Sequence, residues 1–211
     1  MVDADGPAVK HERSSSRIIS LNVGKSPKAI TVQEDKLRQT SSFFRAALDK
    51  HWKEGATGEV ALPEDRLEIV MAYVEWLHRS TLVERSVDEG GEYSDAMWLK
   101  LIRMYVFGDK IQDTKFMNEV LMRVLENLDE SNTCPHEVDI RLAYKSTRPG
   151  SSLRRLFVAA WAAGAKDHWF EAGDEYPEEF MRDLAMQLIR NRGKASRSYW
   201  VKQKDTWLEH E

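Results

Sequence analysis

The period of the apolar positions changes along the chain and predicts strands first and helices later. Residues 17–23 place an apolar side chain at every second position, which is typical of a strand with one buried face. A turn at 24–27 and a second alternating run that ends at Val32 complete a predicted hairpin. Val60 and Leu62 predict a brief third strand.

Helical spacing dominates the rest of the chain. We expect a short helix around Leu37, a helix over 42–53 that Ser41 or Ser42 caps, and a helix that Gly108 ends before Asp113 caps the next. Apolar residues recur every three or four positions in the segments 67–77, 98–106, 117–128, 153–164 and 180–188. A hairpin followed by helices, one short strand and more helices predicts an α+β fold with helices packed on a small sheet. The order excludes a doubly wound parallel sheet, in which strands and helices alternate.

Composition adds a few limits to this picture. The chain has 211 residues, of which 42% are hydrophobic, so it is long enough to bury a core without disulfides or metal. The net charge of −4 gives no general attraction to nucleic acid or acidic membranes. Cys134 is the single cysteine, which excludes an intrachain disulfide and favours a reducing compartment. With no apolar run long enough to span a bilayer, we expect a cytoplasmic or nuclear protein.

The residues that carry chemistry are not arranged as an active site. The six histidines lack metal-site spacing, and glycine-rich phosphate-binding motifs are missing. Carboxylates lie in polar runs, where burial does not shift them toward acid–base work. Cys134 and His136 bring a thiol near an imidazole, but neighbours in sequence seldom act as nucleophile and base, and an ordinary linker cysteine is the simpler interpretation. We therefore expect no enzyme activity, no cofactor, no metal and no small-molecule substrate.

Two motifs indicate a family. The stretches SSFFRAAL at 41–48 and LIRMYVFGDKI at 101–111, taken with the hairpin, Leu37 and the Leu62–Pro63 turn, resemble the BTB/POZ family, in particular its single-domain fungal members. The resemblance covers residues 17–128, with weaker similarity as far as Ala163. It implies a BTB/POZ fold, a small sheet flanked by helical hairpins, that serves as a protein-interaction module. Many members dimerise through the first strand and first helices, and some recruit a cullin scaffold of a ubiquitin ligase.

The resemblance also suggests a division of the chain. Residues 1–16 are read as a disordered N-terminal tail, and residues 17–130 as the BTB/POZ domain. Residues 131–192 form a C-terminal α-helical extension, and residues 193–211 form a basic and aromatic tail.

Six residues are candidates for a protein interface. Leu37 and Phe43 fall on the dimer face that the resemblance implies, and a Leu37→Asp variant is expected to split a dimer without unfolding the monomer. Trp52 lies near a helix end, where a large aromatic is difficult to bury. The other three candidates are Arg17, Glu34 and Ile111, and all three depart from the family pattern.

The departures concern charge and shape. Family members often carry an acid before the first strand and a base after the second, whereas this chain has Arg17 and Glu34 there. If the two residues face one another, they form an opposite-sign pair of reversed polarity; the alternative is two unrelated surface charges. Ile111 stands where an aromatic is common. These differences put a cullin-binding surface in doubt.

Three functions stay open at this point. The leading hypothesis is a module that self-associates as a homodimer or binds another protein. A substrate adaptor of a cullin-type ubiquitin ligase is the second, with the extension after Ser131 as its substrate reader. The third is a nucleic-acid-linked regulator that uses the segment 190–204, where six basic residues surround Tyr199 and Trp200 without any acid. A simpler interpretation of that segment is a tail whose Trp200 and Trp207 pack back on the domain.

Overall fold

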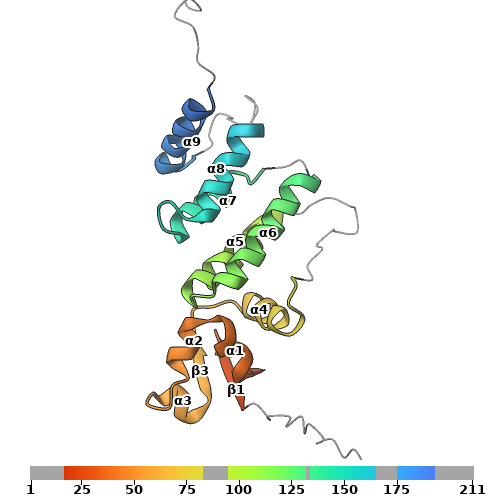
Figure 1. Ribbon diagram of the computed structural model, residues 1–211, viewed down its shortest axis with the longest axis vertical. Coiled ribbons are helices and arrows are strands. Elements are labelled where there is room, and N and C mark those ends of the chain that lie inside the picture. Colours follow the sequence, from red (N-terminus) through yellow and green to blue (C-terminus); the bar gives the residue numbers. More distant parts are fainter. Residues whose placement is uncertain (1–16, 83–94, 132–133, 165–174, 193–211) are drawn as a thin grey trace, which may run out of the picture. The chain divides into compact units, whose positions relative to one another are not determined.

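The computed structural model describes residues 17–82, 95–131, 134–164 and 175–192. Within these residues it contains three strands and nine helices, most of which are labelled in Figure 1, and it confirms the predicted α+β class with a small sheet and flanking helices. The elements are β1 (Ile18–Val23), β2 (Ile30–Gln33), α1 (Glu34–Thr40), α2 (Ser42–Ala47), α3 (Lys53–Thr57), β3 (Glu59–Leu62), α4 (Leu67–Arg79), α5 (Asp95–Lys110), α6 (Thr114–Ser131), α7 (Glu137–Ser146), α8 (Ser152–Gly164) and α9 (Glu178–Asn191). The predicted N-terminal tail over 1–16 and the predicted basic and aromatic tail over 193–211 lie outside the described residues, as do residues 83–94, 132–133 and 165–174.

The chain divides into two compact units. Unit 1 comprises Met1–Arg85 and Arg103–Val120, and unit 2 comprises Ser86–Ile102 and Leu121–Glu211. The helices α5 and α6 therefore contribute residues to both units. Each unit is described by itself below.

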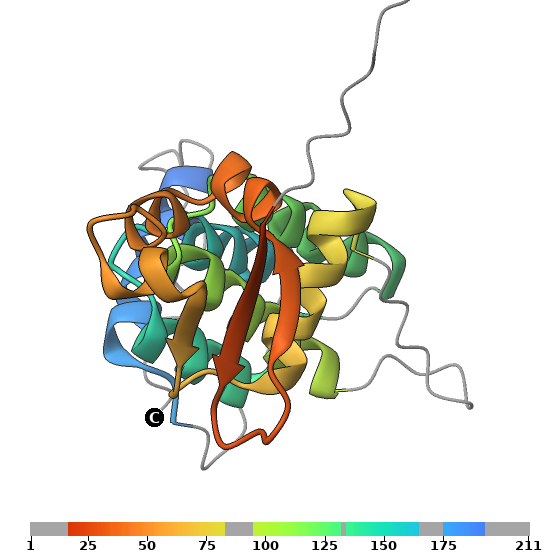
Figure 2. The same cartoon turned by 90° about the horizontal axis from the view of Figure 1, so that it is seen from below.

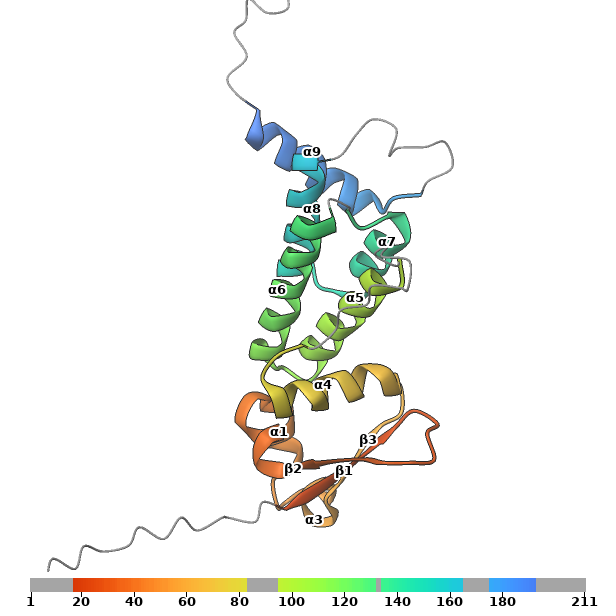
Figure 3. The same ribbon diagram turned by 90° about the vertical axis from the view of Figure 1, so that its right-hand side faces the viewer.

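The sheet of unit 1 has the order β2-β1-β3, with β1 antiparallel to β2 and parallel to β3. Alternation along β1 puts Ile19, Leu21 and Val23 on one face, where all three are buried. Figure 3 shows α4 lying over this face. The other face is open in Figure 2. The strand residues on this open face are Ile18, Ser20, Asn22, Thr31, Gln33, Glu59 and Ala61.

The core of unit 1 is built around Tyr73 of α4. Its ring lies 5.0 Å from that of Phe116, 5.5 Å from that of Phe107 and 6.3 Å from that of Phe44. The Tyr73 hydroxyl donates a hydrogen bond of 2.9 Å to the buried carboxylate of Asp113. The other carboxylate oxygen of Asp113 accepts from the Phe116 amide at 3.0 Å, which confirms the predicted cap of α6.

Gly108 does not end its helix as predicted, because α5 continues to Lys110 and the left-handed residue that follows is Gln112, at φ 52°. An added Cβ at Gly108 would lie 2.8 Å from the Met117 side chain, so this glycine serves the close approach of α6. The helix predicted over 42–53 is also wrong in extent. It ends at Ala47, and a separate five-residue helix, α3, follows.

Unit 2 packs α8 against α9 and α7 around Trp161 and Phe180, whose rings lie 5.6 Å apart. Arg154 of α8 is 4% exposed and holds the three helices together. Its guanidinium donates to the carbonyls of Tyr144 and Thr147 and lies 2.7 Å from the Glu179 carboxylate. Nowhere in the described residues is a helix both long enough and apolar enough to cross a membrane.

Candidate protein-interaction surface

The short helix α3 forms a corner of unit 1 that two glycines make possible. An added Cβ at Gly55 would lie 2.0 Å from the Asp49 carbonyl oxygen, so only glycine fits there. Gly58 has a φ of 77° and ends α3 in the left-handed conformation, which a side chain would strain. The chain then enters β3 at Glu59.

Arg17 fixes this corner to the start of β1. Its guanidinium donates to the carbonyl of Gly55 at 2.5 Å and to that of Ala56 at 3.0 Å. These carbonyls belong to the last turn of α3, where backbone oxygens lack helical partners and a cation is favourable. Arg17 therefore acts as a tie between β1 and α3.

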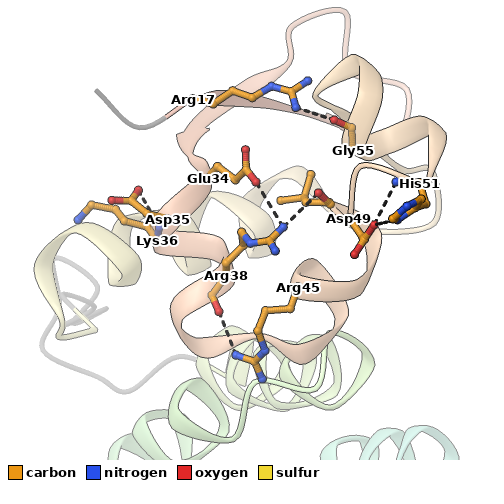
Figure 4. Close-up of polar contacts among 10 residues, drawn as sticks. Arg17, Glu34, Asp35, Lys36, Arg38, Arg45, Asp49, His51 and Gly55 are labelled. Atoms are coloured by element: carbon orange, nitrogen blue, oxygen red, sulfur yellow. Dashed lines mark hydrogen bonds and ion pairs between the residues drawn. The ribbon is translucent and has the colours of Figure 1, made fainter. Parts of the chain in front are cut away.

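The side chains of Arg17 and Glu34 do not pair with each other within the described residues. The backbones do meet as the register required, since the Glu34 amide donates to the Arg17 carbonyl at 2.8 Å. Figure 4 shows the two side chains turned to different partners. The Glu34 carboxylate lies 3.3 Å from Arg38, four residues later on α1. The two charges thus bind two separate helices, so of the two alternatives the structure favours unrelated charges over a facing pair.

Leu37 and Ile111 are core residues and not surface residues. Both side chains are 0% exposed. Leu37 lies on α1, which packs on β2, α2 and α4, and Ile111 follows α5, where its carbonyl accepts from Ser41. The interface role expected of these two residues is corrected accordingly. A Leu37→Asp variant would bury an unpaired carboxylate and is expected to unfold unit 1, so it cannot test a dimer.

The remaining two candidates differ in exposure. Trp52, the residue before α3, is 64% exposed, the largest fraction among the exposed large hydrophobic residues of the described part. Phe43 is half-buried, with its ring edge-on to Phe44 at 5.2 Å. The structure therefore leaves Trp52 as the principal apolar side chain on this side of unit 1.

Ile18 is a surface residue that our sequence reasoning did not single out. It lies on the open face of β1, is 56% exposed and directly follows Arg17, the residue bound to α3. The available signal was the pair Ile18–Ile19, because adjacent apolar residues in a strand must point to opposite faces. Together, Ile18 and Trp52 are called the apolar pair below.

Polar groups lie near Trp52, whose backbone amide donates to the Asp49 carbonyl at 3.0 Å. The Asp49 carboxylate accepts from the His51 backbone amide at 3.0 Å and lies 2.6 Å from its ring, and these contacts with His51 lower the pKa of Asp49. Arg38 donates to the Leu48 carbonyl at 3.1 Å, and Arg45 donates to the Arg38 carbonyl at 2.9 Å, as Figure 4 shows. An apolar centre beside orientable charges is the usual composition of a protein-binding surface.

The geometry speaks against a nucleophile at Cys134. The thiol is half-buried, and burial raises its pKa, whereas a reactive cysteine needs a lowered one. The backbone amide of His136 donates to the Asp139 carboxylate at 3.0 Å, so His136 stands at the start of α7 as part of its N-terminal cap. Among the described residues, no group of three His, Cys, Asp or Glu side chains is close enough to hold a metal ion.

Comparison with known proteins adds no family assignment. A scan against protein-family models found no match, and a search of curated proteins found no significant one. The similarity to the BTB/POZ family therefore stays a prediction from the two motifs, and the surface described above has to be tested directly.

Proposed function

We propose that this chain is a non-enzymatic protein-interaction module that self-associates through the open side of unit 1. One observation supports this most. The sheet face opposite α4 is uncovered within the described residues and presents Ile18, which is 56% exposed, and the adjoining α3 corner presents Trp52, which is 64% exposed. Exposed large apolar side chains, tryptophan above all, are typical anchors of contact surfaces.

The arrangement suits a symmetric contact. A twofold axis would bring the same patch of two copies together, and each Trp52 would meet apolar surface of its mate. The polar residues beside the apolar pair, Arg38, Arg45 and Asp49, would lie at the rim and set the orientation. The resemblance to BTB/POZ proteins points in the same direction, since many of them dimerise through the first strand and first helices.

The area available for the interface limits the affinity that we expect of the dimer. A stable interface buries roughly 1,600 Å² in total, or about 800 Å² on each partner. The outer face of a three-stranded sheet is smaller than this, so the contact must extend over α3 and the neighbouring turn. Such an interface is expected to hold a dimer at micromolar concentration, with Trp52 as its main anchor.

The test is the mass of the purified chain by light scattering after gel filtration. The wild type is expected to be a dimer, and the double variant Ile18→Ser/Trp52→Ser a monomer with unchanged circular dichroism. Met71→Ser is the matched control, because Met71 is 55% exposed on α4, the helix that covers the opposite face of the sheet. A monomeric wild type, or a double variant that keeps the dimer mass, rejects the proposal.

The adaptor hypothesis has its own readout. If the tagged chain purified from a fungal host brings a cullin at near-equal abundance, the chain is a ligase adaptor. If it brings only untagged copies of itself, self-association is the better account. Salt-sensitive DNA binding that disappears on deletion of 190–211 would instead support the nucleic-acid hypothesis.

A further inference from the structure

The last helix of unit 2, α9, has two apolar faces, and one of them is exposed. Phe180 and Leu184 form the buried face, by which α9 packs on α8 and α7. A second row, called the α9 stripe, consists of exposed apolar residues on neighbouring turns of the helix, namely Met181, Ala185, Leu188 and Ile189. Single exposed hydrophobic residues are ordinary, but a contiguous row of them on one helix marks a contact surface.

Opposite charges stand at the two ends of the α9 stripe. Glu178 is the first residue of α9, Arg192 is its C-terminal cap residue, and both are exposed. Each lies seven residues from Ala185, which is about two helical turns, so both charges are on the side of the helix that carries Ala185. Neither side chain has an ion-pair partner among the described residues. The stripe therefore has an acid at one end, a base at the other and its smallest residue midway.

This order of charges is complementary to itself when two copies of α9 lie antiparallel. A twofold axis at Ala185 places Glu178 of one copy beside Arg192 of the other, and the same pair then forms twice. Met181 meets Ile189 of the second copy, because each is four residues from Ala185. An alanine at the axis lets the two helices approach to about 8 Å, at the close end of helix packing distances. A parallel pair would instead bring each charge against its own sign.

We propose that the α9 stripe is a contact between two copies of this chain, which pair antiparallel about Ala185. The charge order favours a second copy over an unrelated protein, because a foreign partner does not require the two ends of the stripe to match each other. The contact belongs to unit 2 and is separate from the open side of unit 1, on which the proposed function rests.

The α9 contact is weaker than the contact proposed for unit 1. Since α9 has 14 residues, a pair of these helices buries less than the roughly 1,600 Å² of a stable interface. Interfaces below about 1,200 Å² are typical of transient contacts, and we expect a dissociation constant on the order of 100 µM. At the micromolar concentrations of gel filtration this contact is open, and at higher concentration it joins the chains into larger assemblies.

The test is sedimentation equilibrium of the full chain at about 10 µM and about 1 mM, on either side of the expected dissociation constant. The starting protein is Ile18→Ser/Trp52→Ser, which lacks the contact proposed for unit 1, and its mass should rise from monomer toward dimer. Glu178→Arg and Arg192→Glu each turn two attractive pairs into two repulsive ones and should weaken association about tenfold. The double change Glu178→Arg/Arg192→Glu restores opposite signs and should restore the association.

Arg190→Glu is the matched control. Arg190 is an exposed base in the last turn of α9, but it lies two positions before Arg192 and so on another side of the helix. This variant should associate like the starting protein. Restoration by the double change is specific to a contact between copies, because in one copy Glu178 and Arg192 are about 21 Å apart along the helix, beyond the screening length of about 8 Å.

A second variant guards against a charge change that frays the ends of α9. Ala185→Glu introduces a good helix former in the middle of the exposed row and puts two like charges at the twofold axis. It should abolish association at about 1 mM while circular dichroism keeps the helix content of the starting protein.

Three results overturn the proposal. A monomer mass at about 1 mM means that the stripe does not pair. Association that survives Ala185→Glu, or that Arg190→Glu weakens as much as Arg192→Glu does, places the contact elsewhere. A double change that stays dissociated rejects the antiparallel pairing. The proposed function is judged separately: a micromolar dimer that persists in Ile18→Ser/Trp52→Ser and is lost in Glu178→Arg rejects the contact of unit 1 and supports that of α9.

Discussion

Ser41 provides the sharpest stability test of unit 1. It is fully buried, and its hydroxyl makes two hydrogen bonds at once. It accepts from the Phe44 amide at 3.1 Å, which caps α2, and it donates to the Ile111 carbonyl at 2.6 Å, which joins α2 to the end of α5. A Ser41→Ala variant removes both bonds and adds no bulk.

The expected loss follows from these two bonds. An N-cap serine contributes about 1 kcal/mol. A buried carbonyl that loses its donor costs about 1–3 kcal/mol. Ser41→Ala should therefore destabilise unit 1 by about 2–4 kcal/mol. With a urea dependence of about 2 kcal/mol per molar, the unfolding midpoint falls by about 1–2 M.

Ser42→Ala is the control for this prediction. Ser42 is the next residue, and its hydroxyl donates to the exposed side chain of Gln112 at 2.6 Å. A surface hydrogen bond of this kind is expected to change stability by less than about 0.5 kcal/mol. Urea unfolding followed by circular dichroism compares the two variants with the wild type. Equal midpoints for Ser41→Ala and Ser42→Ala would refute the assignment of Ser41 as the link between α2 and α5.

Three further predictions address unit 2 and the titrating groups. Arg154→Met should destabilise unit 2 by about 3 kcal/mol, because the Arg154 side chain is buried and donates to four backbone or side-chain oxygens. Glu179→Gln should cost little, because Glu179 is half exposed, and thermal unfolding distinguishes the two variants. Burial raises the pKa of Tyr73 and Tyr144 far above 10.0, with the Asp113 charge as a second cause for Tyr73 and the hydrogen bond to Asp183 for Tyr144. The stability that these two neutral phenols contribute is therefore complete below pH 10.0 and is lost as the pH rises beyond it. The tyrosinate absorbance of these two residues should appear together with unfolding, and Tyr73→Phe should shift that transition. Burial also raises the pKa of Cys134, so its alkylation at neutral pH should be slower in the folded chain than in urea, and an equal rate would contradict the half-buried placement.

The sequence predicted the secondary structure well where one physical cause dominates. The hairpin followed from the alternation of Ile19, Leu21 and Val23 with polar residues, and the cap at Asp113 followed from its position before an apolar helical run. Gly108 was misread because glycine has two uses, the left-handed end of a helix and the close approach of another helix. Only the position of Met117 in space decides between them.

The candidate surface was harder to predict because burial is not a local property. Leu37 lies on a helix of seven residues, too short for its apolar period to distinguish core from contact surface, and it proved fully buried. Arg17 was chosen for its charge, but its role depends on the carbonyls of Gly55 and Ala56, 38 and 39 residues away in the sequence. Ile18 was missed because it was counted with the strand that it begins.

These corrections also make the surface easier to interpret. Since Arg17 is held by the last turn of α3, the start of β1 and the corner that bears Trp52 are fixed relative to one another within unit 1. Contact groups that are already oriented lose less conformational entropy on binding than mobile ones. Arg17→Ala should therefore weaken a contact made by Trp52, although Arg17 itself does not contact the partner. If Arg17 contacted the partner directly, the affinity of the dimer would also depend strongly on salt. The salt dependence of the dimer thus separates a positioning role of Arg17 from the interface charge that its sequence position first indicated.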